Sequence, residues 1–196
     1  MNITNWDQAY QDNLTPWDKG APSPPLVGWL SRNKLSGRVL VPGCGLGHDV
    51  VYLASQGIDA IGLDISPTAV ERAKACHPRH ADRFIQGDLF ELKDSFDAIV
   101  EHTCLCALPP EWRPRYRDAA ASLIKEGGLL VGVFYLNPDM DPGETGPPFG
   151  ISDTELTTLF GDSFEILESQ VPQAAYEGRE GRELLRVLRR RVTPRQ

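Results

Sequence analysis

The sequence predicts an α/β fold with one doubly wound, mostly parallel sheet that ends in an antiparallel β-hairpin. Two observations lead to this prediction. From residue 38 onward, short apolar runs rich in valine, isoleucine and leucine alternate with helix-like segments, which is the pattern of a parallel sheet. After residue 150 one short helix is followed by two neighbouring strand-like runs, which is typical of a hairpin.

The individual elements follow from local signals along the chain. Strands are predicted over 38–41, 60–64, 83–86, 96–103, 128–136, 164–171 and 183–192. Helices are predicted over 49–56, from 66 onward, and over 110–124 and 152–160. Gly57 is suited to stop the first helix, while Ser66 and Ser152 are suited to begin theirs as N-caps. We therefore expect five β–α units and a terminal hairpin.

Composition and charge limit the kind of protein. The 196 residues are enough for a single domain over 1–196, and the net charge of −7 argues against nucleic acid as a partner. Four cysteines are too few for a disulfide framework. No signal peptide or membrane-length apolar run is visible. We expect a cytoplasmic protein, monomeric or homodimeric, with no membrane partner.

A glycine loop, residues 42–47 (PGCGLG), joins the first predicted strand to the first predicted helix. Such a turn points backbone N–H groups and a helix N-terminus at a ligand, and Gly43 and Gly45 allow close approach of the backbone. Asp64 and Asp88 end the next two strands, at the sheet edge where ligands bind in such folds. We expect Asp64 to hold a ribose diol and Asp88 an adenine amino group.

The choice between a dinucleotide and S-adenosyl-L-methionine depends on the loop and on the hairpin. A dinucleotide fingerprint needs a glycine where this chain has the bulky His48. The terminal hairpin also favours a methyltransferase sheet over a dehydrogenase sheet. The sequence therefore predicts S-adenosyl-L-methionine, with a nicotinamide enzyme as the alternative. We expect no metal, because Cys104 and Cys106 form the only close cysteine pair and no histidine pair has helical ligand spacing.

Several stretches spread over most of the chain resemble the thiopurine and thiol (halide) S-methyltransferases, a family of class I methyltransferases with a Rossmann-like fold. The stretches are Trp6, 15–20 (TPWDKG), 41–49 (VPGCGLGHD), 62–66 (GLDIS), 87–90 (GDLF), 103–108 (TCLCAL) and 146–149 (GPPF). Residues 1–26, in which tryptophans and prolines lie among polar residues, are expected to be irregular. The resemblance implies that they cover the cofactor. With the glycine-loop argument, it implies cofactor contacts at Trp6, Trp17, Gly43, Gly45, Asp64, Ile65, Asp88, Leu89 and Glu101.

The resemblance also implies methyl transfer to the sulfur of a thiol, thiopurine or bisulfide by in-line displacement, leaving S-adenosyl-L-homocysteine. A thiol has a pKa of roughly 8.5, so a dedicated base is optional. Catalytic candidates are Tyr135, His102 and Tyr10, with 137–151 as an active-site loop. Acidic residues in that loop favour neutral or thiol acceptors over halide. The alternatives are an O- or N-methyltransferase, a halide or thiocyanate methyltransferase, and a cofactor-binding protein without turnover.

Overall fold

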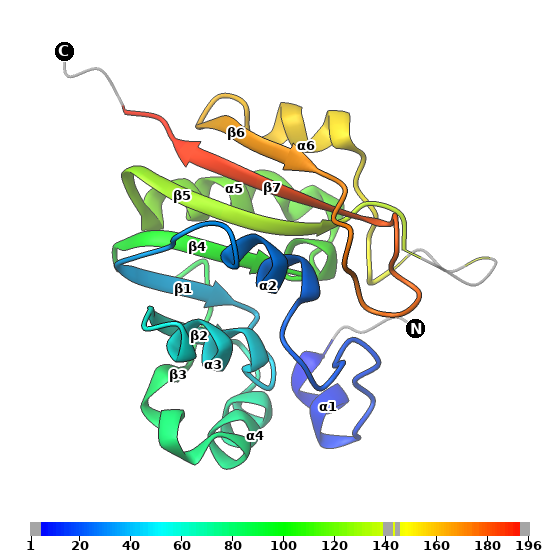
Figure 1. Cartoon of the computed structure of the whole chain (residues 1–196). Helices are drawn as coiled ribbons and strands as arrows, with labels where there is room; N and C mark the ends of the chain where they lie inside the picture. The colour runs from blue at the N-terminus through cyan, green and yellow to red at the C-terminus, as the bar shows by residue number, and fades with distance from the viewer. Residues whose placement is uncertain (1–4, 139–142, 144–145, 193–196) are drawn as a thin grey trace.

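The computed structural model describes residues 5–138, 143 and 146–192, and its strands form one sheet (Figure 1). The strand order is β3-β2-β1-β4-β5-β7-β6. The strands are β1 (Arg38–Pro42), β2 (Asp59–Asp64), β3 (Phe84–Gln86), β4 (Phe96–His102), β5 (Ile124–Tyr135), β6 (Phe164–Gln170) and β7 (Glu183–Arg190). Only β7 runs antiparallel to its neighbours, β5 and β6, which confirms the predicted fold class and the terminal hairpin.

Helices cover both faces of the sheet (Figure 1). The α-helices are α1 (Trp6–Gln11), α2 (Pro24–Leu30), α3 (His48–Ser55), α4 (Pro67–Cys76), α5 (Arg113–Leu123) and α6 (Asp153–Phe160). Three short 3₁₀ helices are η1 (Pro78–Arg83), η2 (Leu105–Ala107) and η3 (Pro110–Trp112). One apolar core lies between the sheet and α2, α3 and α4, and the other between the sheet and α5 and α6. Burial on both faces explains the continuous apolar character of the central strands.

The predicted helix boundaries depend on caps that the structure contains. Ser66 Oγ accepts the Ala69 N–H at 3.0 Å, and Ser152 forms a capping box with Glu155. Gly57, two residues after α3, has φ of 79°, a left-handed conformation that favours glycine. These three signals are local, so they could be identified in the sequence without knowledge of the fold.

Two expectations about the elements were wrong. The first 26 residues are not wholly irregular, because α1 forms there and α2 begins at Pro24. Asn5 caps α1 by accepting the Gln8 N–H at 3.1 Å, but six residues are too short to show helical periodicity. The third β–α unit is also missing. The segment 87–95, which links β3 to β4, contains turns and no helix.

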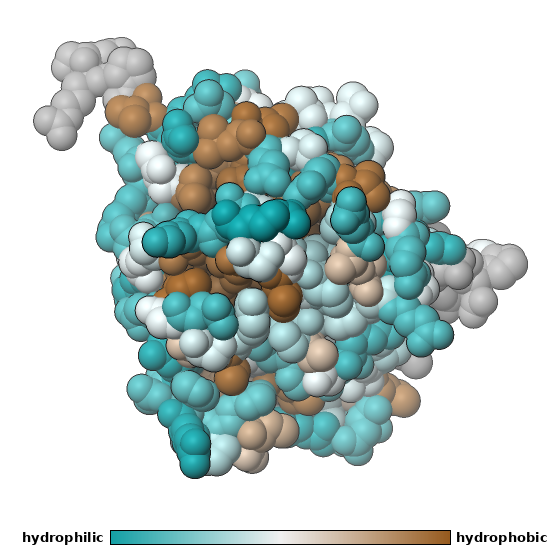
Figure 2. Space-filling view, in the orientation of Figure 1, coloured by the Kyte–Doolittle hydropathy of each residue, from teal (hydrophilic) through white to brown (hydrophobic). Residues whose placement is uncertain are grey.

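The face seen in Figure 2 is mostly hydrophilic, with apolar patches over its upper part, where β6 and β7 lie. Ile166 and Leu167 of the edge strand β6 are each 41% exposed. Helix α2 is linked to β6 by Trp29, whose Nε1 donates to Glu168 Oε2 at 2.9 Å. None of the helices in the described ranges combines the length and the apolar character that a membrane crossing requires.

Candidate active site

The glycine loop lies at the carboxyl edge of the parallel strands, between β1 and α3. Gly43, Gly45 and Gly47 have φ of 59°, 52° and 82°, so the turn depends on residues without a Cβ. A Cβ on Gly45 would stand 2.7 Å from Tyr10 Oη, and one on Gly47 would collide with the Phe84 ring. Gly43 and Gly45 therefore face a cavity, while Gly47 allows the loop to pack on β3.

Asp64 ends β2 and holds this loop by a hydrogen bond to its backbone. Its Oδ2 accepts the Gly45 N–H and its Oδ1 accepts the Ser66 N–H, both at 2.9 Å. The residue is 6% exposed, and this burial raises the pKa of the carboxyl group despite the two hydrogen bonds. Each carboxylate oxygen has a second lone pair, so these backbone bonds leave Asp64 able to accept from a ligand.

The other predicted contacts at this edge lie along β2 and β3. Asp88 follows β3, and its Oδ1 accepts the Phe90 N–H at 2.8 Å, which fixes the turn. Leu89 is half-buried against the core on the α5 side of the sheet. Ile65, next to Asp64, is 53% exposed, which is unusual for an apolar residue at a strand end. Their roles in holding a cofactor stay predictions.

Glu101 lies deeper than the sequence suggested. It is 1% exposed, and its two oxygens accept the Leu105 N–H at 3.0 Å and the Tyr116 Oη–H at 2.5 Å. Burial raises the pKa of this carboxyl group. Glu101 is not among the residues that line the cavity. Its visible role is to hold the turn after β4, and a cofactor contact stays a prediction.

The N-terminal segment brings three aromatic residues to the glycine loop. Trp17 makes edge contacts with Trp6 at 5.4 Å and Tyr10 at 5.8 Å between ring centres, and its Nε1 donates to Tyr10 Oη at 3.1 Å. Tyr10 is 4% exposed, and burial raises the pKa of its hydroxyl group. The segment is held by Asp18, whose Oδ1 lies 3.0 Å from His48 Nε2. The N-terminal segment thus lies against the glycine loop, and its role as a cofactor cover stays a prediction.

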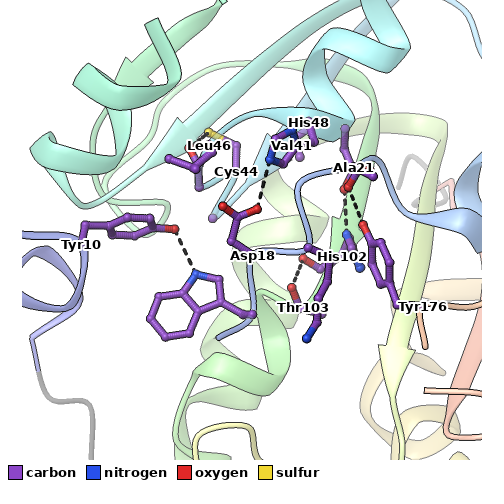
Figure 3. Close-up of a pocket in the computed structure, with 15 residues that line it drawn as sticks. Tyr10, Asp18, Ala21, Val41, Cys44, Leu46, His48, His102, Thr103 and Tyr176 are labelled. Carbon is purple, nitrogen blue, oxygen red and sulfur yellow. Dashed lines mark hydrogen bonds and ion pairs between the residues drawn. The ribbon is translucent and has the colours of Figure 1, made fainter. Parts of the chain in front are cut away.

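A cavity of about 70 Å³ lies beneath this cover. Its walls come from four parts of the chain: the N-terminal segment, the glycine loop with the start of α3, the end of β4, and the connection between β6 and β7 (residues 171–182). Tyr176 lies in that last connection and lines the cavity (Figure 3). The connection was not singled out from the sequence. The candidates Tyr10 and His102 both line the cavity.

His102 ends β4 and faces the cavity from an unusual turn. The next residue, Thr103, has φ of 62°, which costs roughly 1–3 kcal/mol for a β-branched residue. His102 Nδ1 lies 2.7 Å from Asp49 Oδ2, and Tyr176 stacks on the imidazole at 5.9 Å between ring centres. Burial lowers the pKa of His102, but the Asp49 carboxylate outweighs it, so the pKa is raised.

The histidine–carboxylate pairs were missed at the sequence level. No pair stands out by spacing, but folding joins His102 to Asp49 and His48 to Asp18. Asp49 lies two residues after the glycine loop, so a carboxylate at the start of α3 was the only available signal. Its partner comes from another strand, and sequence distance alone could not connect them.

Tyr135, the third catalytic candidate, lies outside the cavity lining. It is 9% exposed at the end of β5, with the Arg179 guanidinium 4.8 Å from its ring centre. Arg179 is paired with the buried Glu183 at 3.2 Å. The expected wall formed by 137–151 falls partly outside the described residues, including its acidic positions 139, 141 and 144. In its described part, Phe149 N–H donates to Cys106 O at 2.7 Å.

A metal centre finds no support in the part of the chain that the structure describes. No group of three or more histidine, cysteine, aspartate or glutamate side chains there is arranged to hold an ion. The four cysteines are free, and Cys106 is packed in the interior. The positive-φ glycines, the buried Asp64 and the aromatic cover instead fit S-adenosylmethionine.

The strand order, the glycine loop and the carboxylate that ends β2 define a class I S-adenosylmethionine-dependent methyltransferase. A solved structure with this fold is the 1,6-didemethyltoxoflavin-N1-methyltransferase of Burkholderia thailandensis with bound S-adenosylhomocysteine. Its TM-score is 0.73 at 20% identity, with 94% of this chain and 85% of that chain covered.

The chain belongs to the thiopurine S-methyltransferase family, whose model matches residues 1–193. A probable thiol methyltransferase 2 of Arabidopsis thaliana is 35% identical, with 89% of this chain and 81% of the relative covered. Thiocyanate methyltransferase 1 of Brassica oleracea is 33% identical, with 92% and 82% covered. These matches confirm the resemblance noted in the sequence and the prediction of an S-adenosylmethionine-dependent enzyme.

Proposed function

We propose that this protein transfers the methyl group of S-adenosylmethionine to the sulfur of a small thiol or hydrosulfide held in the cavity. The observation that carries the proposal is the partly open cavity beside Gly43 and Gly45. A volume of about 70 Å³ has room for only a few water molecules, so it suits a small acceptor. Membership of the thiopurine S-methyltransferase family and similarity to a probable thiol methyltransferase support sulfur as the acceptor atom.

When bound, S-adenosylmethionine supplies an electrophilic methyl group on a sulfonium. The contribution of the chain is to place the acceptor in line with that methyl group and to keep water out. Tyr10, Trp17 and Tyr176 form aromatic walls suited to both tasks. Such positioning is worth roughly 7–11 kcal/mol of the barrier. The free cysteines suit the reducing cytoplasm, where we place this activity.

A product assay tests the proposal directly. The purified chain is incubated with S-adenosylmethionine and, in separate reactions, an alkyl thiol, hydrosulfide, thiocyanate, a halide or an aromatic alcohol. Mass spectrometry follows the methylated product and S-adenosylhomocysteine. We expect a methyl thioether from the alkyl thiol and methanethiol from hydrosulfide, each with an equal amount of S-adenosylhomocysteine.

Other outcomes would overturn the proposal. Methylation of the alcohol alone would indicate an O-methyltransferase, and turnover of thiocyanate or halide alone would replace thiols as the acceptor. Binding of S-adenosylmethionine without S-adenosylhomocysteine in any reaction would indicate a cofactor-binding protein that does not turn over.

A further inference from the structure

We infer that His102 is the catalytic base of this site, with its Nε2 accepting the proton of the acceptor thiol, and that Asp49 is its positioning residue. The inference rests on the proposed function as a thiol methyltransferase. It assigns a proton acceptor to a reaction that does not strictly need one, because a thiol is partly ionised near neutral pH.

The two ring nitrogens of His102 have different environments. Nδ1 lies 2.7 Å from Asp49 Oδ2, so the carboxylate keeps a proton on Nδ1 and leaves Nε2 as the acceptor in the neutral ring. Nε2 is buried and has no hydrogen-bond partner among the described residues. Leaving a buried polar atom without a hydrogen bond is unfavourable, so a ligand that donates to Nε2 removes this cost.

The ring is held in this orientation from both sides. Asp49 Oδ1 accepts the Ser23 N–H at 2.7 Å, which fixes the carboxylate between α2 and α3. Tyr176 stacks on the imidazole with 24° between the ring planes, and its hydroxyl donates to Ala21 O at 2.6 Å (Figure 3). A base whose rotamer is locked by such contacts loses little entropy when the acceptor arrives.

Proton and electron pairs balance in the proposed step. The S–H proton moves to His102 Nε2, and the freed sulfur electron pair forms the new bond to the methyl carbon. The old bond between methyl and sulfonium breaks, and its electron pair stays on the adenosyl sulfur as a neutral thioether. The imidazolium, paired with Asp49, loses its proton to solvent when the products leave.

Charged groups around the imidazole set the pH range. Burial disfavours the imidazolium and so does the Arg179 guanidinium, but the carboxylates outweigh both, and the pKa of His102 is raised above its usual 6.5. The neutral, base-competent form is therefore populated only as the pH rises through that raised value. The titratable and charged groups facing the ring are Asp49 on α3, Glu101 on β4, Tyr176 and Arg179 in the β6–β7 connection, and Glu183 on β7.

The test compares His102→Gln with the wild-type chain on two acceptors, an alkyl thiol and an aryl thiol that is already ionised at the assay pH. We expect kcat/KM for the alkyl thiol to fall roughly 10²- to 10⁴-fold, the usual worth of a general base. The ionised aryl thiol has no proton to lose and should change by less than about tenfold. His80→Gln on η1, outside the cavity, is the matched control.

A pH profile adds a readout that a structural role would not change. For the wild type, kcat/KM with the alkyl thiol should rise with pH through the raised pKa of His102, and this limb should vanish in His102→Gln. Asp49→Asn removes the carboxylate that raises this pKa. In that variant the rise of kcat/KM should therefore occur at lower pH. Binding of S-adenosylmethionine by calorimetry checks that the variants are folded.

The outcomes separate the two levels of the claim. Suppose that the wild type methylates both thiols. If His102→Gln then loses activity on both thiols equally, or keeps activity on both, His102 is not the base and only this inference is wrong. If the wild type binds S-adenosylmethionine but methylates neither thiol, the proposed function itself is wrong.

Discussion

At the scale of single residues, two of the three acidic groups predicted to hold the cofactor are buried in different surroundings. Asp64 lies at the base of the glycine loop, with backbone N–H groups on each oxygen. Glu101 is buried in the interior, where it accepts hydrogen bonds from Tyr116 and Leu105. Both are buried carboxylates, yet only Asp64 touches the loop where a ligand would lie.

Replacing Asp64 should therefore affect ligand affinity directly. We expect Asp64→Ala to weaken S-adenosylmethionine binding by at least tenfold, because the substitution removes both the ribose acceptor and the support of Gly45. Isothermal titration calorimetry measures the change, with circular dichroism to verify folding. Asp59→Ala, at the exposed start of β2, serves as the control. Unchanged affinity in Asp64→Ala would rule out the ribose assignment.

Residues that end strands could be predicted because period and spacing place them at one edge of the sheet. Asp64 and Asp88 were found in this way. The pairing of His102 with Asp49 could not, because it joins the end of β4 to the start of α3, and no spacing rule links these elements. The stacking of Tyr176 on that histidine could not be predicted either, because it depends on the path of the β6–β7 connection.

At the scale of elements, the N-terminal segment combines a helix with an aromatic cluster. Asp7 on α1 accepts the Ser66 Oγ–H at 2.7 Å and the Thr68 N–H at 2.9 Å, which binds α1 to the start of α4. The tryptophans and prolines of this segment indicated a cover but not a helix. A cover attached by polar contacts at its ends can change its fit to a ligand without unfolding the sheet.

Trp17 is the residue of this cover whose loss should separate binding from folding. It is half-buried and contacts Tyr10 and Trp6 rather than the sheet. We expect Trp17→Ala to weaken S-adenosylmethionine binding severalfold, while the melting temperature of the ligand-free chain changes little. Fluorescence titration and thermal melts measure the two effects. Trp112→Ala, at an exposed tryptophan on η3, is the matched control. A lower melting temperature with normal binding would make Trp17 a packing residue only.

At the scale of the whole molecule, the fold was the most predictable property. The central strands are buried on both faces, so their apolar runs identify a parallel sheet directly. The absence of a helix between β3 and β4 could not be predicted. The general rule that strands and helices alternate does not show which individual β–α unit lacks its helix. The site draws on the N-terminal segment, α3, β4 and the β6–β7 connection, so ligand binding should stabilise the chain as a unit.

Thermal stability therefore provides a whole-molecule test. S-adenosylhomocysteine at about 100 times its Kd should add roughly 2.7 kcal/mol to the free energy of unfolding. For a chain of this length, that corresponds to a rise in melting temperature of roughly 5–11 °C. Differential scanning fluorimetry measures it, and NAD at the same concentration should give no shift. A shift with NAD alone would instead indicate a nicotinamide enzyme.

The antiparallel course of β7 has a consequence for how acceptor preference can diverge among relatives. Because the 171–182 connection joins β6 to β7, it supplies Tyr176 to the cavity wall from a part of the chain separate from the glycine loop between β1 and α3. Insertions or deletions in such a surface turn leave strand pairing intact. Exchange of this turn between family members should transfer the preference for the methyl acceptor, while the site for the methyl donor is retained.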